Sequence, residues 1–349
     1  MRLFGDQRKR HGPRLWHIWI VLPLTFLAAL VIATSVFTVG WDLLAVRGLK
    51  PEHRIDSKTL FDLVKLSFGV VAGAGALVAL VVAYRRQRVD EDGAMREATR
   101  LHTERFTTAV SQLGDDSAAV RLGGVHALAG LADDAPTRDL RQTCIDVLCA
   151  YLRMPYTAEA DLPPDDAAAR HSYLALREVR HTVIRIIRDH LREEPPGNRS
   201  WGGHNFDFTG VVFDGGDLSG SRFLSGGTVT FDRARFAAGT FDLGETRFLG
   251  GHMTFVNTEF AGAEVTFHAV RTFRGSILFR RVSFTGGVVT FRKAYFGYGC
   301  EVRFYPAEQA GGRVDFRDCG GTEPEGVRAW AEETPRPADF LLPARWRTT

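Results

Sequence analysis

The side chains that could perform catalysis or bind a metal ion are few and widely spaced in this chain. Cys144 and Cys149 lie five residues apart on a predicted helix, so they face different directions. With Cys300 and Cys319, they show no CxxC or Cys/His ligand spacing, which favours free thiols in a reducing compartment. The sequence contains no P-loop, GxSxG, HExxH or dinucleotide-binding fingerprint. We therefore predict that the protein is not an enzyme and has no catalytic, cofactor-binding or metal-binding residues.

The acidic, histidine and arginine residues near the predicted helices favour structural roles. Asp133 and Asp166 stand at expected helix ends, where carboxylates are solvated or cap a helix. His181 and His190 flank an apolar stripe without a second ligand at i+4, which indicates surface histidines. The same helix carries a row of arginines that either forms a solvated face, which we favour, or contacts anionic lipid: Arg177, Arg180, Arg185, Arg188 and Arg192.

The element that dominates the chain is a repeat from Thr228 to Gly299. Six twelve-residue units follow one another without a gap, from TVTFDRARFAAG to VVTFRKAYFGYG. The fourth and ninth places of the unit are bulky and apolar in nearly every copy. Because side chains alternate along a strand, places 2 and 4 share one face, and so do places 7 and 9. Each unit is therefore expected to form two short strands, and the stacked units to form a solenoid filled with Phe.

Before these units, the bulky apolar residue recurs at a shorter spacing of five residues, in FDFTG, VVFDG, GDLSG and SRFLS. Over about residues 205 to 305, the sequence resembles the pentapeptide-repeat family. That resemblance implies a right-handed, four-sided β-helix with the central Leu or Phe inside. The expected solenoid core is Phe208, Phe213, Leu218, Phe223, Phe231, Phe236, Phe248, Phe255, Phe260, Phe267, Phe279, Phe284, Phe291 and Phe296.

The spacing departs from the family after Phe231, where steps of five and seven residues alternate. We interpret the two extra residues as a widened corner, which gives a coil of 24 residues. A flat, two-sided coil of 12 residues is the alternative, and it would bring successive units into direct register.

Two apolar runs predict a transmembrane hairpin over residues 15–84. After a basic N-terminus at 1–14, the spans cover about 15–40 and 66–84, each long enough to cross a hydrocarbon core of ~30 Å. The density of Lys and Arg at the outer ends favours a multi-pass protein of the plasma membrane with both termini and the soluble domains in the cytoplasm. Gly69 and Gly73 form either a homo-oligomer contact or a packing face against the first span.

The remaining chain divides by composition into four segments. Residues 89–193 read as a helical domain, 194–204 as a linker, 205–319 as the solenoid, and 320–349 as a tail that caps the solenoid or, second, docks as a peptide. The fold class is thus a membrane-anchored α + β protein. This whole arrangement also resembles uncharacterised actinobacterial two-span membrane proteins, a resemblance that implies no activity.

One basic cluster stands out in the solenoid, with only Glu301 nearby to oppose it. It is a candidate binding patch for a protein, an anionic lipid or nucleic acid, or it is plain surface decoration: Arg271, Arg274, Arg280, Arg281, Arg292, Lys293 and Arg303. With both termini inside and a 24-residue coil, it would form two basic corners in the cytoplasm.

These features predict a non-enzymatic, membrane-anchored scaffold that presents a rigid β-solenoid to a cytoplasmic protein partner. The alternative is a regulator or inhibitor of an enzyme such as a topoisomerase, because some pentapeptide-repeat proteins mimic DNA. Such mimics are strongly acidic, whereas residues 205–319 contain 12 acidic and 13 basic residues. The near-neutral balance and the membrane anchor disfavour DNA mimicry and make nucleic acid an unlikely partner.

Overall fold

The computed structural model describes residues 57–193, 199–305, 311–332 and 339–346, together with some of the residues from 23 to 42. The chain divides into two compact units, Met1–Glu97 and Ala98–Thr349, which are described separately.

The helix α2 (Ser57–Leu113) includes the second predicted span, 66–84. From Leu60 onwards it is long and apolar enough to cross a membrane, judged by length and composition. It is the one such helix among the described residues, where the sequence predicted two. The first predicted span, 15–40, lies largely outside the described residues, although those described from 23 to 39 are helical. A side chain added at Gly69 or Gly73 would meet no described atom within 4 Å, so these glycines make no close helix contact within the described part of the chain.

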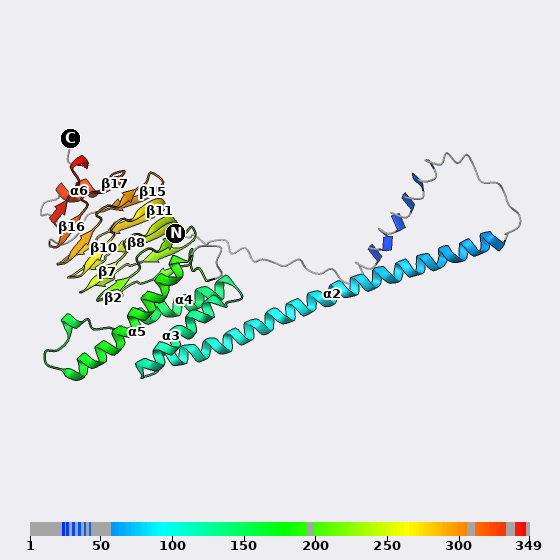
Figure 1. The fold of residues 1–349 in the computed structure, drawn as a ribbon, viewed down its shortest axis with the longest axis horizontal. Coiled ribbons are helices and arrows are strands. Elements are labelled where there is room, and N and C mark those ends of the chain that lie inside the picture. The colour runs from blue at the N-terminus through cyan, green and yellow to red at the C-terminus, as the bar shows by residue number, and fades with distance from the viewer. Residues whose placement is uncertain are drawn as a thin grey trace, which may run out of the picture. The chain divides into compact units, whose positions relative to one another are not determined.

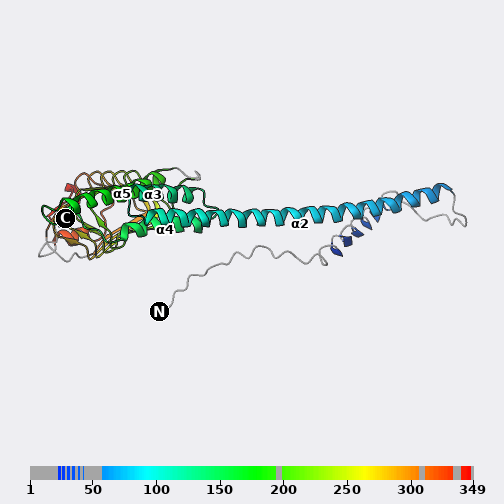
Figure 2. The same ribbon diagram turned by 90° about the horizontal axis from the view of Figure 1, so that it is seen from below.

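Helices also form the first part of the second unit. Beyond the end of α2 they are α3 (Ala118–Asp133), α4 (Arg138–Arg153), the short 3-10 helix η1 (Glu159–Asp161) and α5 (Ala167–Arg192). Thr137 caps α4 by accepting from Leu140 N at 3.3 Å, and Asp166 caps α5 by accepting from Ala169 N at 2.9 Å. The predicted cap at Asp166 is therefore confirmed. Leu128, Leu148 and Ile187 join α3, α4 and α5 in one buried core. Figure 2 shows these three helices close to one another.

A β-solenoid of about 5 turns follows, from residue 206 to 341, with its strands stacked in parallel (Figure 1). This confirms the predicted solenoid and fits a pentapeptide-repeat-like fold. The strands are β1 (Phe206–Asp207), β2 (Val212–Phe213), β3 (Gly216–Asp217), β4 (Arg222–Phe223), β5 (Thr228–Thr230), β6 (Arg235–Phe236), β7 (Thr240–Asp242), β8 (Arg247–Val256), β9 (Glu259–Phe260), β10 (Glu264–Thr266), β11 (Arg271–Arg280), β12 (Ser283–Phe284), β13 (Val288–Thr290), β14 (Tyr295–Phe296), β15 (Cys300–Phe304), β16 (Arg313–Asp315), β17 (Gly320–Gly321) and β18 (Asp339–Leu341).

The strand register settles the length of the coil. Val229 is paired with Met253, and Phe255 with Phe279, so each coil advances by 24 residues. The alternative of a 12-residue coil is wrong. Two successive units make one coil, and their four short strands form its four sides. β8 and β11 are longer because each continues through one corner, from the end of one even-numbered unit into the next unit.

The corner between the two strands of each twelve-residue unit is a tight turn. The sixth place of every unit has a positive φ without being glycine: Arg233 (57°), Glu245 (57°), Asn257 (56°), Ala269 (54°), Arg281 (50°) and Lys293 (58°). At several of these corners the N–H of place 7 donates to the carbonyl of place 4, as from Ala294 to Phe291 at 2.9 Å. A positive φ at the third residue of a four-residue turn is the signature of a type II turn. Gly210 takes the same position in the first coil, with φ 72°.

The inward places form ladders of stacked aromatic rings. All the predicted core residues are buried, with at most 4% of any side chain exposed. Phe231, Phe255, Phe279 and Phe304 stack in one column, with centroids 4.6 to 4.9 Å apart. Because each ring is covered by the rings of the coils on either side, the interior coils leave little apolar area exposed.

Both ends of the solenoid are covered. The tail forms α6 (Val327–Glu332), pairs β18 with β16, and places Trp346 of η2 (Ala344–Trp346) 5.8 Å from the Phe316 ring centroid. The described part of the tail therefore packs over the last coil, and β18 continues one sheet of the solenoid. At the other end, α4 and α5 pack against the first coil (Figure 1). Covered ends prevent the strand edges from pairing with another chain.

Candidate functional site

The arginines of α5 join the helical segment to the solenoid. Arg180 is 3% exposed and donates to the carbonyls of Leu152, at 2.6 Å, and Val212, at 2.7 Å. Arg188 forms an ion pair with Asp217, and Arg192 donates to Ser219 O at 2.6 Å. All three arginines contact the first coil of the solenoid. Arg180 is buried, so the expectation of a solvated or lipid-facing row is wrong for it, whereas Arg192 is exposed as well as bonded to Ser219.

Asp214 lies at the centre of the contact between the helical segment and the first coil of the solenoid, which we call the joint. Its carboxylate is 4% exposed and accepts from the hydroxyls of Tyr156 at 2.5 Å and Tyr173 at 2.7 Å. His181 Nε2 lies 3.3 Å from Oδ1, and Arg177 Nε 3.4 Å from Oδ2. Burial alone would raise the pKa of Asp214, but the hydrogen bonds from His181 and the two tyrosines outweigh it and hold that pKa well below its usual range. Burial and the bond to Asp214 raise the pKa of Tyr173 to about 12.

A second carboxylate with several partners, the half-buried Asp133, lies at the end of α3. It accepts from Trp201 Nε1 at 3.1 Å and lies 3.2 Å from His190 Nε2. His190 is 8% exposed and its ring stacks on Trp201 with centroids 4.1 Å apart, so it is not the predicted surface histidine. Of the expected linker, 194–198 lies outside the described residues. Trp201 is fully buried, so the described end of that segment belongs to the core.

The outer surface of the solenoid carries a row that we call the ridge, on β8, β11 and β14. Its members are the exposed residues at places 8, 10 and 11 of the even-numbered units: Arg247, Leu249, Arg271, Phe273, Arg274, Tyr295 and Tyr298. Phe273 and Tyr295 are each 47% exposed, and Tyr298 is 93% exposed. Elsewhere in the described solenoid, Tyr305 is the one other large apolar or aromatic side chain with comparable exposure.

Two arginines lie directly opposite each other on the ridge. Arg271 of β11 is the register partner of Arg247 of β8. Neighbouring strands are ~4.8 Å apart, and like charges directly opposite destabilise a sheet. The backbone N–H groups of Arg247 and Arg271 join the ladder, but the side chains of Arg247, Arg271 and Arg274 form no ion pair or hydrogen bond with any described residue. The ridge thus combines uncompensated charge with exposed aromatic rings, and Tyr, Phe and Arg are residue types that are enriched in protein interfaces.

The structure distributes the predicted basic patch over several places rather than one. Arg271 and Arg274 lie on the ridge. Arg280 and Arg281 are exposed at the corner that follows β11, and Arg292 and Lys293 at the corner that follows β13. Arg292 is paired with Asp318 at 3.2 Å, and Arg303 of β15 with Glu301 and Glu325 at 3.3 and 3.0 Å. The four corner residues thus occupy two separate corners, as a 24-residue coil requires.

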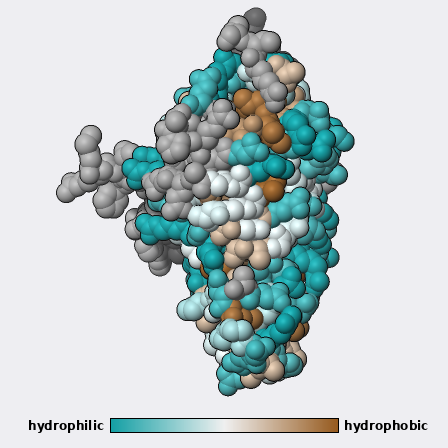
Figure 3. Space-filling model, turned by 90° about the vertical axis from the view of Figure 1, so that its left-hand side faces the viewer, coloured by the Kyte–Doolittle hydropathy of each residue, from teal (hydrophilic) through white to brown (hydrophobic). Residues whose placement is uncertain are grey.

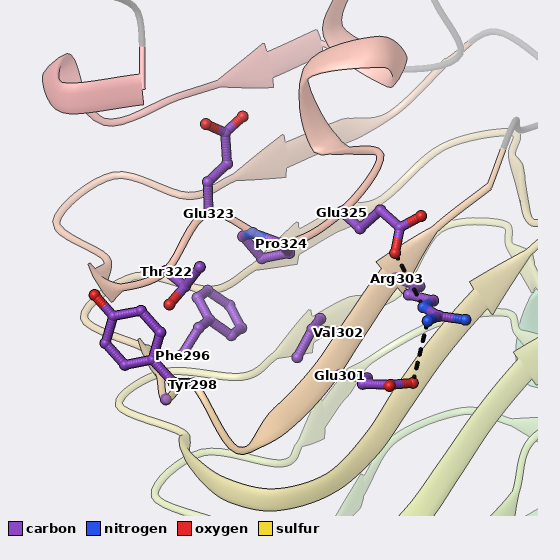
Figure 4. Close-up of a pocket in the computed structure, with 10 residues that line it drawn as sticks. Phe296, Tyr298, Glu301, Val302, Arg303, Thr322, Glu323, Pro324 and Glu325 are labelled. Carbon is purple, nitrogen blue, oxygen red and sulfur yellow. Dashed lines mark ion pairs between the residues drawn. The ribbon is translucent and has the colours of Figure 1, made fainter.

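A small groove adjoins the C-terminal end of the ridge. Figure 4 shows Tyr298 and Phe296 on one side, Glu323 and Pro324 above them, and Arg303 between Glu301 and Glu325. The groove has a volume of about 180 Å³. Its carboxylates are already paired, since Glu323 also pairs with Arg328 at 3.0 Å. Among the described residues, no three His, Cys, Asp or Glu side chains gather as metal ligands would.

On the face shown in Figure 3, hydrophobic residues form small brown patches that are separated by hydrophilic residues. No protein-family model, curated protein or solved structure matches this chain. The resemblance to pentapeptide-repeat proteins therefore rests on the quoted sequence units and on the solenoid itself.

Sequence reasoning missed Leu249, Phe273, Tyr295 and Tyr298. A signal for them does exist, because places 8 and 10 differ between odd and even units. Place 10 holds Ala237, Ala261 and Thr285 in the odd units, but Leu249, Phe273 and Gly297 in the even ones. Once the coil is known to contain two units, sorting the copies by parity brings the larger residues to one corner.

Proposed function

We propose that this protein is a non-enzymatic, membrane-anchored scaffold, and that its solenoid holds the ridge as a rigid binding surface for a cytoplasmic protein. The observation that carries the proposal is the unneutralised pair Arg247 and Arg271 beside the exposed rings of Phe273 and Tyr298. The partner that fits would place acidic side chains around an apolar centre.

The rigidity of the surface supports this role. The ridge stands on strands whose inner faces are filled by stacked rings, and the Asp214 and Asp133 clusters fasten the solenoid to the helical segment. Binding to a pre-organised surface loses less conformational freedom than binding to a mobile loop. The basic character of the ridge also argues against DNA mimicry.

The membrane anchor is the second part of the proposal. The apolar stretch of α2 supplies one span, and the run at 15–40 would supply the other. Both termini would then lie in the cytoplasm, as favoured by the basic residues at 1–14 and by Arg85, Arg86 and Arg88. Gly69 and Gly73 would be free to meet a second copy of the chain.

Thiol labelling tests the topology in whole cells. In a C300S background, Lys50→Cys and the exposed solenoid variant Glu264→Cys each supply a single accessible thiol, since Cys144, Cys149 and Cys319 are buried. An impermeant reagent should label position 50 and not position 264 in intact cells. Labelling of position 264 but not of position 50 would reverse the assignment.

Charge reversal on the ridge tests the binding surface without weakening the fold. Arg271→Glu places opposite charges across β8 and β11, which should stabilise the sheet by ~0.2–1 kcal/mol. The full-length variant in detergent should melt no lower than the parent but lose the membrane-derived partner that the parent captures. Arg233→Glu is the control and should capture it like the parent, because Arg233 is an exposed corner residue away from the ridge, with the same backbone conformation as Glu245. Equal capture by all three proteins would remove the ridge from the proposal.

A further inference from the structure

A cleft of about 360 Å³ lies between α5 and the first coils of the solenoid. One wall is a stripe of α5 at helical spacing: Arg177, His181, Arg185 and Arg188. The other is made by Asp214, Gly215, Gly216, Asp217, Gly239 and Thr240. The cleft is on a different element from the ridge, and the scaffold role does not use it.

The carboxylates of the cleft are already engaged within the protein. Asp214 is held by two tyrosines, His181 and Arg177, as described above. Asp217 accepts through Oδ1 from the Ser219 N–H at 2.8 Å and hydroxyl at 2.6 Å, and through Oδ2 from Arg188. Arg188 is used on its other side by Asp189, 2.8 Å away. The charges of these groups neutralise one another, so Asp214, Asp217 and Arg188 are not the groups that would bind an outside ligand.

Two arginines of the same stripe are only partly used. Arg177 meets Asp214 through Nε alone, at 3.4 Å. Arg185 donates from one terminal nitrogen to the Thr182 hydroxyl at 3.1 Å, and has no carboxylate partner among the described residues. They lie two helical turns apart on one face, with His181 between them. Each guanidinium carries five donors, so both retain several N–H groups for a ligand in the cleft.

Glycines keep the opposite wall open. Gly215 has φ 117°, and an added side chain would approach Thr240 O to 3.3 Å and the His181 ring to 3.5 Å. A side chain at Gly216 would meet the Phe241 ring at 2.8 Å. A Cβ at Gly215 would therefore reduce the space beside His181, whereas a Cβ at Gly216 would point into the core, towards Phe241 and Ile184.

We propose that this cleft binds a phosphate-class oxyanion, held by the free guanidinium donors of Arg177 and Arg185 and by His181. Guanidinium groups recognise phosphate through paired hydrogen bonds, and the surplus of cations over carboxylates in the cleft favours an anion. The same chemistry is offered by a free phosphate or phosphomonoester and by the phosphate headgroup of a lipid.

The primary test is calorimetric titration of the full chain in zwitterionic nanodiscs with inorganic phosphate, at constant ionic strength with chloride. Arg185→Gln should weaken binding by about tenfold or more, since it removes charge-assisted hydrogen bonds. Arg185→Lys should retain part of the affinity because it keeps the charge. Arg170→Gln removes an exposed arginine of the same helix, which pairs with Glu159 outside this cleft, and should bind like the parent.

A second arm identifies the source of the anion. Nanodiscs that contain phosphatidic acid should abolish the phosphate titration if the headgroup is the ligand, and should leave it unchanged if the ligand is a free phosphate. In the parent, Arg185 forms no hydrogen bond or ion pair with a described residue of the solenoid, so the melting temperature of Arg185→Gln should match that of the parent and a loss of binding would not reflect misfolding. No binding by the parent in either arm, or equal loss in Arg185→Gln and Arg170→Gln, would overturn the proposal.

Discussion

The ring of Phe255 stacks on that of Phe279 with centroids 4.6 Å apart and planes within 1° of parallel. The two residues are 24 positions apart in the chain and occupy the same place in successive coils. This relationship unites the repeat, the length of the coil and the aromatic core.

Phe255→Ala should destabilise the solenoid severely. The substitution removes a fully buried ring that has stacked neighbours above and below, and large-to-small aromatic changes in cores cost ~3–5 kcal/mol. Thermal unfolding of the full chain in detergent, followed by circular dichroism, measures the loss. Phe273→Ala, on the half-exposed ridge, is the matched control and should melt near the parent. Similar melting temperatures of the two variants would show that the residue at place 4 does not point into the solenoid core.

Ala269→Gly should stabilise the protein. Ala269 has φ 54°, a left-handed conformation that costs an L-residue ~1–2 kcal/mol. Glycine removes that strain but gives the unfolded chain more freedom, which leaves a net gain of roughly 0.5–1 kcal/mol. Ala294→Gly should destabilise instead. Ala294 is buried at place 7 of the unit in the next coil, and its backbone is not left-handed. A lower melting temperature for Ala269→Gly would contradict the corner geometry.

The joint between α5 and the solenoid should weaken in alkali. The pKa of Tyr173 is raised to about 12, whereas an unfolded tyrosine titrates near ~10. The unfolded state therefore loses this proton first, and the stability contributed by Tyr173 declines as the pH rises from about 10 to about 12. Denaturant unfolding across this range should show a shallower decline for Tyr173→Phe than for the parent. Tyr298→Phe, whose side chain is exposed, should keep the parental slope; a parental slope in Tyr173→Phe would exclude this role.

The core of the solenoid could be predicted because the repeat period is visible in the amino-acid sequence. Places 4 and 9 recur every twelve residues, and alternation along a strand sends both inward, which holds for Phe255 and Phe260 alike. The choice between 12 and 24 residues per coil needed the stacking itself, although the crowding of like charges in a shorter coil favoured the longer one.

The joint could not be predicted, because its partners are distant in sequence. Arg180 reads as one more charge on an amphipathic helix, yet it reaches the carbonyl of Val212 in another element. Asp133 likewise has the sequence context of a solvated helix end, yet it is half-buried and accepts from Trp201, which is 68 residues further along the chain. Only the packing of helix on solenoid brings such donors and acceptors together.

Site-directed photo-crosslinking in living cells tests the ridge most directly. A photoreactive amino acid is placed at Phe273 or Tyr298 on the ridge, and at Glu264, an exposed position on β10 in a different sheet. We expect one discrete protein adduct from each ridge position, its loss when Arg271→Glu is added, and no such adduct from Glu264. No protein adduct from the ridge, adducts of lipid or nucleic acid alone, or the same protein adducts from Glu264 would contradict the role of the ridge as a protein-binding surface.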